Sequence, residues 1–235
     1  MIDPDREVAE LRAYLGDAYD EGKLQRHQAE IEEELARTGD EQRFYRTSEA
    51  YLYDLTAFAT WGVKQPYLDT ITELVAEGAR LLDVGCGIGS DGLALIEAGY
   101  AVTFADFDNP STRYLRWRLE HRGLAAAIVD LDEQPLPAGQ DLAYAFDVIE
   151  HVDEPTDLLD RMEASATTVV VNLLEPAAGD PSHHRDLPIP DLLARAARHR
   201  VRAYAVHHGR SHLVAYDSAP AGALTRLRSR ARVRA

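Results

Sequence analysis

The chain has 235 residues, of which 46% are hydrophobic and 28% are charged, as in ordinary globular proteins. This length favours a single domain with a substantial core, and no apolar run approaches the roughly 20 residues that cross a bilayer. The first residues lack the basic and apolar blocks of a signal peptide, and the single Cys86 excludes an internal disulfide. We therefore expect a cytoplasmic protein with no membrane partner.

The net charge of −15 bears on the partners of the protein. Nucleic-acid-binding proteins normally present a basic surface, because phosphate contacts supply most of their affinity. The composition therefore disfavours DNA as a partner. One segment near the end is basic, with arginine at every second position: Arg226, Arg228, Arg230, Arg232 and Arg234. This tail is either a docking segment for an acidic partner or RNA, or an exposed end that offsets an acidic body.

Residues 1–78 are predicted to be helical, because apolar residues recur there at helical spacing. Leu11 and Leu15 mark one such stripe, and Leu24 and Ile31 belong to a second. A third stretch is rich in aromatic side chains, which are Tyr45, Tyr51, Tyr53, Phe58, Trp61 and Tyr67. These are more aromatic residues than one helix needs for packing, although packing accounts for about half of them.

A predicted strand over 81–84 leads into a turn with glycine at every second position, and a helix begins at Ser90. Because Gly85, Gly87 and Gly89 have no Cβ, their backbone can approach a ligand closely. The dinucleotide fingerprint is Gly-x-Gly-x-x-Gly, and its third position falls on Ser90 here. The spacing therefore argues against a nicotinamide oxidoreductase.

From residue 79 onward, predicted strands alternate with helices, which is typical of a parallel sheet covered on both faces. The predicted strands and the closing hairpin lie at 101–106, 126–131, 141–146, 167–172, 201–206 and 213–216. A helix over 111–122 carries Arg116, Arg118 and Arg122 toward its C-terminal end, where the helix dipole favours cations.

Four of these segments resemble, in order, the motifs of class I S-adenosylmethionine (SAM)-dependent methyltransferases: 83–89, 101–106, 126–131 and 141–152. The resemblance implies an α/β fold, a Rossmann-like seven-stranded mostly parallel sheet with a closing antiparallel hairpin. It also implies SAM as cofactor. We expect a helical lid that binds substrate over 1–78, a SAM-binding core over 79–223 and the basic tail over 224–235.

The resemblance assigns cofactor contacts to the strand ends, where open α/β sheets bind ligands. Gly85 and Gly87 would admit the methionine portion, and Asp83 would face its ammonium group. Asp106 would accept hydrogen bonds from both ribose hydroxyls, with Phe107 beside it covering the adenine. Asp83 could instead cap the turn, and Asp106 could cap the following helix.

Two further segments resemble the rest of the cofactor site. Asp130 and Leu131 would hold the adenine amine and ring, although Asp132 and Glu133 are close enough to take the role of Asp130. Phe146, followed by Asp147, would lie near the methionine end.

Methyl transfer needs alignment and, for a hydroxyl or carbon acid, a base with a pKa near neutral. Histidine is the first candidate, and His151 and His184 follow the fourth and fifth strands; a structural role for His151 is equally open. The expected acceptor contacts are Tyr51, Trp61, Asn172, Glu175 and His183. The spacing of the histidines matches no metal-ligand motif, so we expect no metal.

The sequence therefore predicts methyl transfer from SAM to a small molecule in specialised metabolism. We expect the acceptor atom to be N or O rather than C. Two alternatives stay open: a protein or RNA methyltransferase recruited by the arginine-rich tail, and a catalytically silent SAM-fold binding subunit. The intact glycines and Asp106 argue against the silent subunit. The sequence leaves the oligomeric state open.

Overall fold

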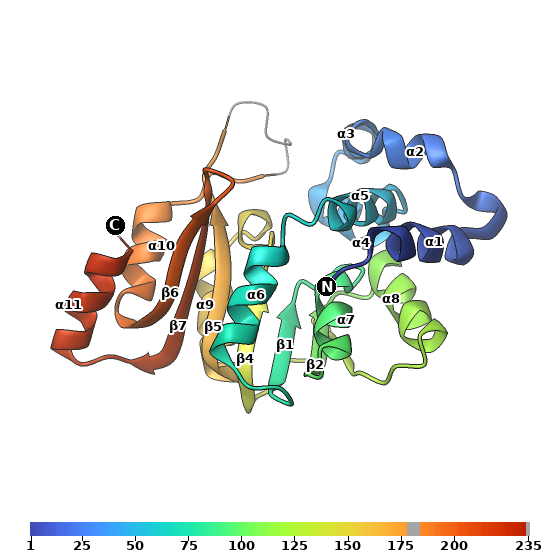
Figure 1. The fold of residues 1–235 in the computed structure, drawn as a ribbon. Coiled ribbons are helices and arrows are strands. Elements are labelled where there is room, and N and C mark those ends of the chain that lie inside the picture. Colours follow the sequence, from blue (N-terminus) through green and yellow to red (C-terminus); the bar gives the residue numbers. More distant parts are fainter. Residues whose placement is uncertain (178–183, 234–235) are drawn as a thin grey trace. The chain divides into compact units, whose positions relative to one another are not determined.

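The computed structural model describes residues 1–177 and 184–233 (Figure 1). The chain forms two compact units, and each contains segments that are distant in sequence. Unit 1 comprises Met1–Gln65 and Gly85–Gln134, and unit 2 comprises Pro66–Val84 and Pro135–Ala235. The N-terminal helices thus share a unit with the glycine-rich turn.

Unit 1 is mostly helical and contributes one parallel pair of strands. Its elements are α1 (Pro4–Leu15), the 3-10 helix η1 (Gly16–Ala18), α2 (Glu21–Gln25), α3 (His27–Thr38), α4 (Glu41–Thr47), α5 (Ala50–Thr60), α7 (Ser90–Glu97), β2 (Ala101–Asp106), α8 (Pro110–His121) and β3 (Ile128–Asp130). Asn109 begins α8 as an N-cap whose side chain accepts from Thr112 N. In the β2–β3 pair, Asp106 lies opposite Asp130.

Unit 2 contains the larger part of the sheet. Its elements are α6 (Gln65–Leu74), β1 (Arg80–Val84), β4 (Gln140–Ala145), the 3-10 helix η2 (Ile149–His151), α9 (Pro155–Ser165), β5 (Ala166–Leu174), α10 (Ile189–Ala196), β6 (His199–His207), β7 (Ser211–Pro220) and α11 (Ala223–Arg232). Strands β1, β4 and β5 run parallel, and β7 runs antiparallel to both β5 and β6. Helix α9 packs on β4 and β5, and α10 packs on β6 and β7.

Among the described residues, seven strands form one sheet in the order β3-β2-β1-β4-β5-β7-β6. The predicted fold class is confirmed, including the closing antiparallel hairpin and the N-terminal helices. The strand order reverses beside β1, and open α/β sheets bind ligands at such a reversal. The buried runs 81–84 and 142–146 line the core of unit 2, as expected for strands covered on both faces.

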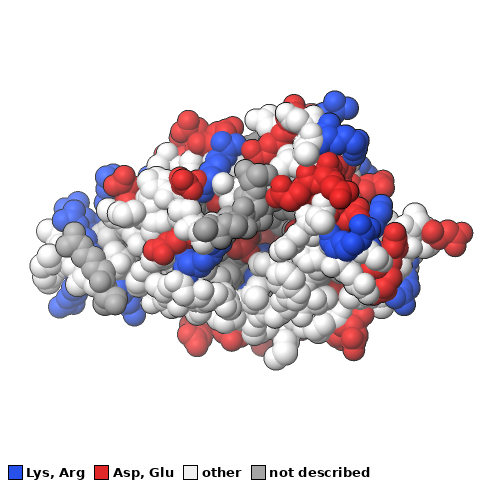
Figure 2. Space-filling view, turned by 90° about the horizontal axis from the view of Figure 1, so that it is seen from above, with Lys and Arg blue, Asp and Glu red and all other residues white. Residues whose placement is uncertain are grey.

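The arginine-rich segment forms helix α11 as far as Arg232, and this helix packs on β6 within unit 2. Arg234 lies outside the described residues. The Ser229 hydroxyl accepts from Val201 N at 3.0 Å, and Arg232 donates to the Val201 carbonyl at 3.1 Å. Seen from above, Lys and Arg gather at the end of unit 2 that carries α11, whereas Asp and Glu gather over the N-terminal helices of unit 1 (Figure 2). Within the described residues, every helix is too short or too polar to traverse a bilayer.

Candidate functional site

The glycine turn after β1 has a backbone that only glycine adopts without strain. The φ angles of Gly85, Gly87 and Gly89 are 70°, 52° and 74°, all in the left-handed region. A Cβ on Gly87 would lie 2.9 Å from Leu55 Cδ1 of α5, and a Cβ on Gly89 would overlap Leu115 of α8. Gly87 therefore leaves bare backbone beneath α5, whereas Gly89 is required for packing against α8.

Asp106 ends β2 as a half-buried carboxylate whose orientation is fixed. Its Oδ2 accepts from Gly87 N at 2.8 Å, and its Oδ1 accepts from Phe107 N at 2.7 Å. Burial raises the pKa of Asp106 despite these two bonds, and the charge of Asp130 adds to the rise. Because each carboxylate oxygen can accept more than one bond, Asp106 keeps capacity for a ligand with two hydroxyls.

Phe107 is covered by a cation from the N-terminal helices. The Arg46 guanidinium of α4 lies 4.4 Å from the centre of the Phe107 ring. Arg46 also forms a two-pronged ion pair with Asp132, in which Nη2 and Oδ1 are 2.9 Å apart. This pairing lowers the pKa of Asp132. Asp132 is thus engaged with Arg46, while Asp130 accepts from Asp132 N at 3.0 Å and Leu131 N donates to the Asp106 carbonyl at 3.0 Å.

In unit 2, Asp83 and Phe146 are buried beside aromatic side chains. Asp83 of β1 is 4% exposed and lies opposite Tyr144 of β4. The Phe146 ring lies 5.1 Å from the Tyr144 ring and 5.1 Å from the Tyr67 ring. Asp147 follows Phe146 in the chain.

Asp147 adopts a left-handed backbone, with φ at 56°, which is uncommon outside glycine. Its N–H donates to Asn172 Oδ1 at 2.8 Å, and Asn172 Nδ2 donates to Asp147 Oδ1 at 2.8 Å. Asn172 is fully buried and also donates to the Ser211 hydroxyl at 3.2 Å, to which Tyr67 donates at 2.7 Å. Asn172, expected to contact the acceptor, thus holds the backbone of Asp147, and strained residues of this kind cluster at functional sites.

The two predicted bases come together in unit 2. The rings of His151 and His184 meet edge to face, with centres 4.8 Å apart. A backbone hydrogen bond joins the residues next to the two histidines, since Arg185 N donates to the Glu150 carbonyl at 2.9 Å. His183, the neighbouring candidate, lies outside the described residues.

Glu175 belongs to a polar cluster of unit 2 that also contains His212 and Tyr204. Its Oε1 is 2.8 Å from His212 Nε2, and His212 Nδ1 is 2.7 Å from the Tyr204 hydroxyl. Burial raises the pKa of Tyr204, and the charge of Glu175 adds to the rise. Glu175 therefore orients His212 in this structure.

Tyr51 and Trp61 lie in different aromatic groups of unit 1. Tyr51 packs edge-on against Phe44 and Tyr45, at 5.8 and 5.4 Å between ring centres. Trp61 is 52% exposed and meets the His27 ring edge-on at 5.5 Å. Trp61 thus presents a large aromatic surface to solvent.

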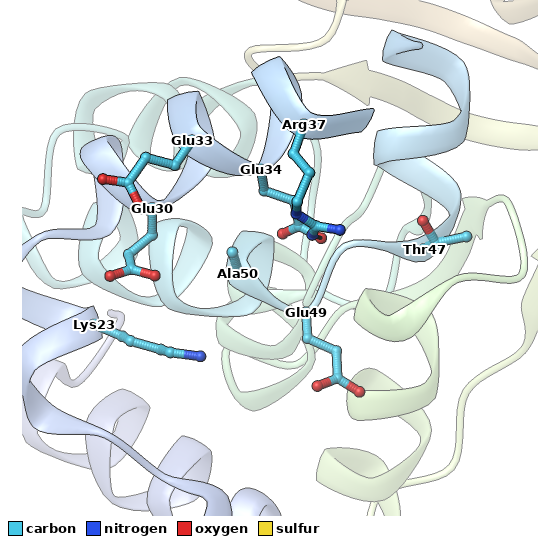
Figure 3. A pocket seen from close by; sticks show the side chains of 8 residues that line it. All are labelled: Lys23, Glu30, Glu33, Glu34, Arg37, Thr47, Glu49 and Ala50. Atoms are coloured by element: carbon cyan, nitrogen blue, oxygen red, sulfur yellow. Dashed lines mark hydrogen bonds and ion pairs between the residues drawn. The ribbon is translucent and has the colours of Figure 1, made fainter. Parts of the chain in front are cut away.

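Unit 1 also contains an open pocket of about 580 Å³ whose lining is polar, with glutamate as half of the lining residues (Figure 3). The lining residues are Lys23, Glu30, Glu33, Glu34, Arg37, Thr47, Glu49 and Ala50. None of the predicted site residues is among them. In the part of the chain that the structure describes, no group of three or more His, Cys, Asp or Glu side chains is arranged to hold a metal ion.

Two features of the site are not evident from the sequence. Arg46 belongs to no recognisable sequence motif, and its contact with Phe107 arises only from the fold. The left-handed conformation of Asp147 is equally hidden, although aspartate tolerates this region better than most residues. In the sequence, the only sign of this conformation is that an aspartate follows the fourth strand.

Comparison with known proteins identifies the fold and the domain. Residues 82–168 match a family model described as a methyltransferase domain. The structure is similar to the magnesium protoporphyrin IX methyltransferase ChlM from Synechocystis PCC 6803 with bound S-adenosylhomocysteine (SAH), at 14% identity and a TM-score of 0.59, over 80% of this chain and 98% of that one. The comparison with curated proteins gives no match.

Two other similar structures are of proteins whose names include a small molecule, mitomycin or pyocyanin. The mitomycin 7-O-methyltransferase MmcR shares 19% identity at a TM-score of 0.59, over 92% of this chain and 73% of that one. The pyocyanin biosynthetic protein PhzM shares 21% identity at a TM-score of 0.55, over 77% of this chain and 62% of that one. At these identities the likeness establishes the fold.

Proposed function

We propose that the chain is a class I SAM-dependent methyltransferase that methylates a nitrogen or oxygen atom of a small molecule. When bound, SAM supplies a methyl group that its sulfonium has already activated. The protein therefore has to bind the cofactor, orient the acceptor, exclude water and accept a proton where the acceptor carries one.

The carboxylate of Asp106 carries the cofactor half of the proposal. It is fixed by the N–H groups of Gly87 and Phe107 and retains acceptor capacity that suits a ribose diol. The bare backbone at Gly85 and Gly87 suits the methionine portion, and Asp130 and Leu131 suit the adenine beside Phe107. Asp83 and Phe146 complete the proposed set.

For the acceptor half we favour His151 and His184 as proton acceptors, because they are the predicted bases that the fold brings into contact. Tyr51, Trp61 and Glu175 remain proposed acceptor contacts, and Asn172 would act through Asp147. A small acceptor is also supported by the similar structures, because MmcR is a mitomycin 7-O-methyltransferase and PhzM is a pyocyanin biosynthetic protein.

The helices before residue 78 are proposed to form the lid. Within unit 1, Leu55 of α5 lies over Gly87 and Arg46 of α4 lies over Phe107, so these helices cover the residues proposed for the cofactor. A lid of this kind would exclude water from the sulfonium.

Calorimetric titration with SAH tests the cofactor half of this function. We expect the wild-type chain to bind SAH and the Asp106→Ala variant to bind it at least tenfold more weakly, because bonds to a charged group are lost. Transfer of a labelled methyl group from SAM to a panel of amines and phenols then tests the acceptor class. A wild-type chain that binds no SAH would contradict the proposal.

A further inference from the structure

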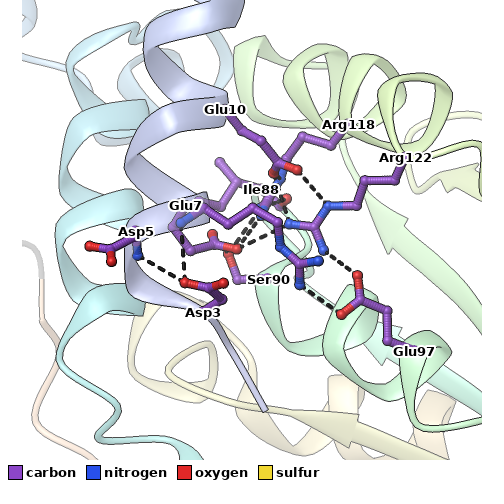
Figure 4. Close-up of polar contacts among 10 residues, drawn as sticks. Asp3, Asp5, Glu7, Glu10, Ile88, Ser90, Glu97, Arg118 and Arg122 are labelled. Carbon is purple, nitrogen blue, oxygen red and sulfur yellow. Dashed lines mark hydrogen bonds and ion pairs between the residues drawn. The ribbon is translucent and has the colours of Figure 1, made fainter.

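A buried ion cluster in unit 1 connects α1 to the glycine turn (Figure 4). Its centre is Arg118 of α8, which is 0% exposed. Arg118 Nε donates to Glu10 Oε2 at 2.8 Å, and its Nη2 donates to Glu7 Oε1. Both carboxylates belong to α1 and are 2% and 4% exposed for Glu7 and Glu10.

The remaining donor group of Arg118 points at the turn itself. Its Nη1 donates to the Ile88 carbonyl at 2.8 Å and to the Ser90 hydroxyl at 3.0 Å. Ile88 stands between Gly87 and Gly89, and Ser90 begins α7. The Ser90 hydroxyl in turn donates to Glu7 Oε2 at 2.6 Å, so α1 and the turn share one hydrogen-bonded cluster.

The outer part of the cluster leaves the turn untouched. Arg122 Nε donates to Glu10 Oε1 at 2.7 Å, and its Nη1 donates to Glu97 at 3.0 Å. Its Nη2 also donates to Glu10 Oε2 at 2.8 Å and to Glu7 Oε1 at 3.3 Å, so Arg122 shares both carboxylates with Arg118. Arg6 reaches Glu97 at 2.7 Å, near the surface. The cluster therefore has a centre that bonds the turn and a rim that only joins helices.

The buried positive charge of Arg118 requires the carboxylates of α1. A guanidinium stays protonated at every physiological pH, and a buried cation is costly unless anions pair with it. In the described part of the chain, the carboxylates that pair with Arg118 are Glu7 and Glu10. The cation that bonds the turn is thus neutralised from α1.

We propose that Arg118 is a positioning residue for the cofactor turn and that Glu7 and Glu10 set its position. Arg118 has no direct role in the transfer step; it fixes the Ile88 carbonyl and the start of α7 so that the backbone at Gly87 accepts the cofactor. Docking of α1 and binding of SAM are therefore coupled, and each strengthens the other. This inference rests on the proposed placement of SAM at the turn.

The Arg118→Lys variant tests the inference, because lysine keeps the charge but cannot serve both carboxylates and the turn at once. We expect its SAH dissociation constant and its KM for SAM to rise about tenfold, within the range typical of coupled sites, with kcat nearly unchanged. The matched control is Arg6→Lys, which weakens the rim at Glu97 and touches neither the turn nor the carboxylates of Glu7 and Glu10. We expect it to lower the melting temperature and to leave SAH affinity within about twofold.

Two further variants serve if Arg118→Lys does not fold. Glu7→Gln removes one neutralising charge at constant shape, and Ser90→Ala removes one bond to the turn; both should weaken SAH binding severalfold. Hydrogen exchange adds a readout of coupling. SAH should slow the exchange of α1 amides in the wild type, and much less so in these variants.

The outcomes separate the two proposals. If the wild type binds no SAH, the proposed function fails and takes this inference with it. If the wild type binds SAH, and the folded variants at Arg118, Glu7 and Ser90 bind it equally well, the positioning role is overturned while the proposed function stands.

Discussion

Asp106 illustrates how the tertiary structure fixes a single side chain at a strand end. Its place at a strand end is visible in the sequence, but its two bonds from Gly87 N and Phe107 N are tertiary. Burial raises its pKa, so the ionised group is less stable here than in the unfolded chain. The stability that Asp106 contributes is therefore complete below the ordinary aspartate pKa and is lost as pH rises through the raised pKa.

The raised pKa predicts how SAH affinity depends on pH. A protonated carboxyl group accepts fewer hydrogen bonds, so SAH affinity should fall as pH drops through a midpoint above the ordinary value of 3.8. Calorimetry at a series of pH values measures this midpoint. Asp106→Asn should remove the dependence and weaken binding at neutral pH by about tenfold or more.

Asp108→Asn is the matched control for this experiment, since Asp108 lies two residues further on and pairs with Arg113 and Arg116 at the surface. It should leave both the affinity and its pH dependence unchanged. An equal loss in both variants would contradict the role of Asp106.

The histidine pair gives a prediction about proton transfer. Because general bases contribute roughly 100-fold or more, replacing both His151 and His184 by alanine should lower kcat/KM by about that factor while SAH still binds. Steady-state kinetics with the identified acceptor provides the measurement. His121→Ala, on the exposed end of α8, is the control. A double variant within about threefold of the wild type would exclude both histidines as bases.

At the scale of elements, the same residue type has different roles on different helices. The arginines of α8 were assigned to the helix dipole, yet Arg118 is wholly buried and bonded to α1 and the turn. The arginines of α11 stay exposed, apart from the bond between Arg232 and β6. The arginines of α8 and α11 differ in burial, and the spacing of apolar residues along a helix indicates burial only in part.

Helix α11 therefore allows a test of the macromolecular alternative. Replacing Arg226, Arg228 and Arg230 by glutamine removes charge and spares the residues that pack on β6. For a small-molecule enzyme we expect kcat/KM to change by less than about twofold, since exposed charges contribute little locally. A large loss that depends on salt would instead indicate a protein or RNA substrate.

The glycine turn gives a prediction for stability. Gly89→Ala should lower the free energy of unfolding by about 2 kcal/mol or more, because the new Cβ meets Leu115 and the backbone is left-handed. Gly123→Ala is the control, since its φ of 64° is similar but no atom lies within 4 Å. Denaturant unfolding of both variants isolates the overlap with Leu115. Equal losses would show that backbone strain alone matters.

At the scale of the whole molecule, the helices over residues 1–65 belong to the same compact unit as the glycine turn. Their removal would delete Leu11 and Leu52, expose Ile88 and Tyr114 of the same apolar cluster, and leave Arg118 without Glu7 and Glu10. Losing one partner of a buried ion pair typically costs about 3–5 kcal/mol.

Deleting residues 1–60 should therefore abolish methyl transfer and SAH binding together. Circular dichroism, calorimetry and a transfer assay on the truncated chain check this expectation. A truncated protein that still binds SAH and turns over its acceptor normally would refute the proposed lid.

Local patterns in the sequence were enough for the fold class. The glycine spacing, the strand-ending acid at Asp106 and the alternation of strands and helices are short-range features. The family resemblance that rests on them predicted SAM as cofactor and the seven-stranded sheet with its closing hairpin, and the structure confirms the sheet. Element ends moved by a few residues, as in β3, which is shorter than the predicted 126–131.

Contacts between distant segments were decided only by the tertiary structure. Arg46 on Phe107, Asn172 on the left-handed Asp147 and the cluster around Arg118 join residues 25 to 111 positions apart. No periodicity encodes such pairings, because they depend on how helices and strands pack and on which charges that packing buries. The sequence by itself determined which residues stand at the strand ends, and packing determined which distant side chains hold them in place.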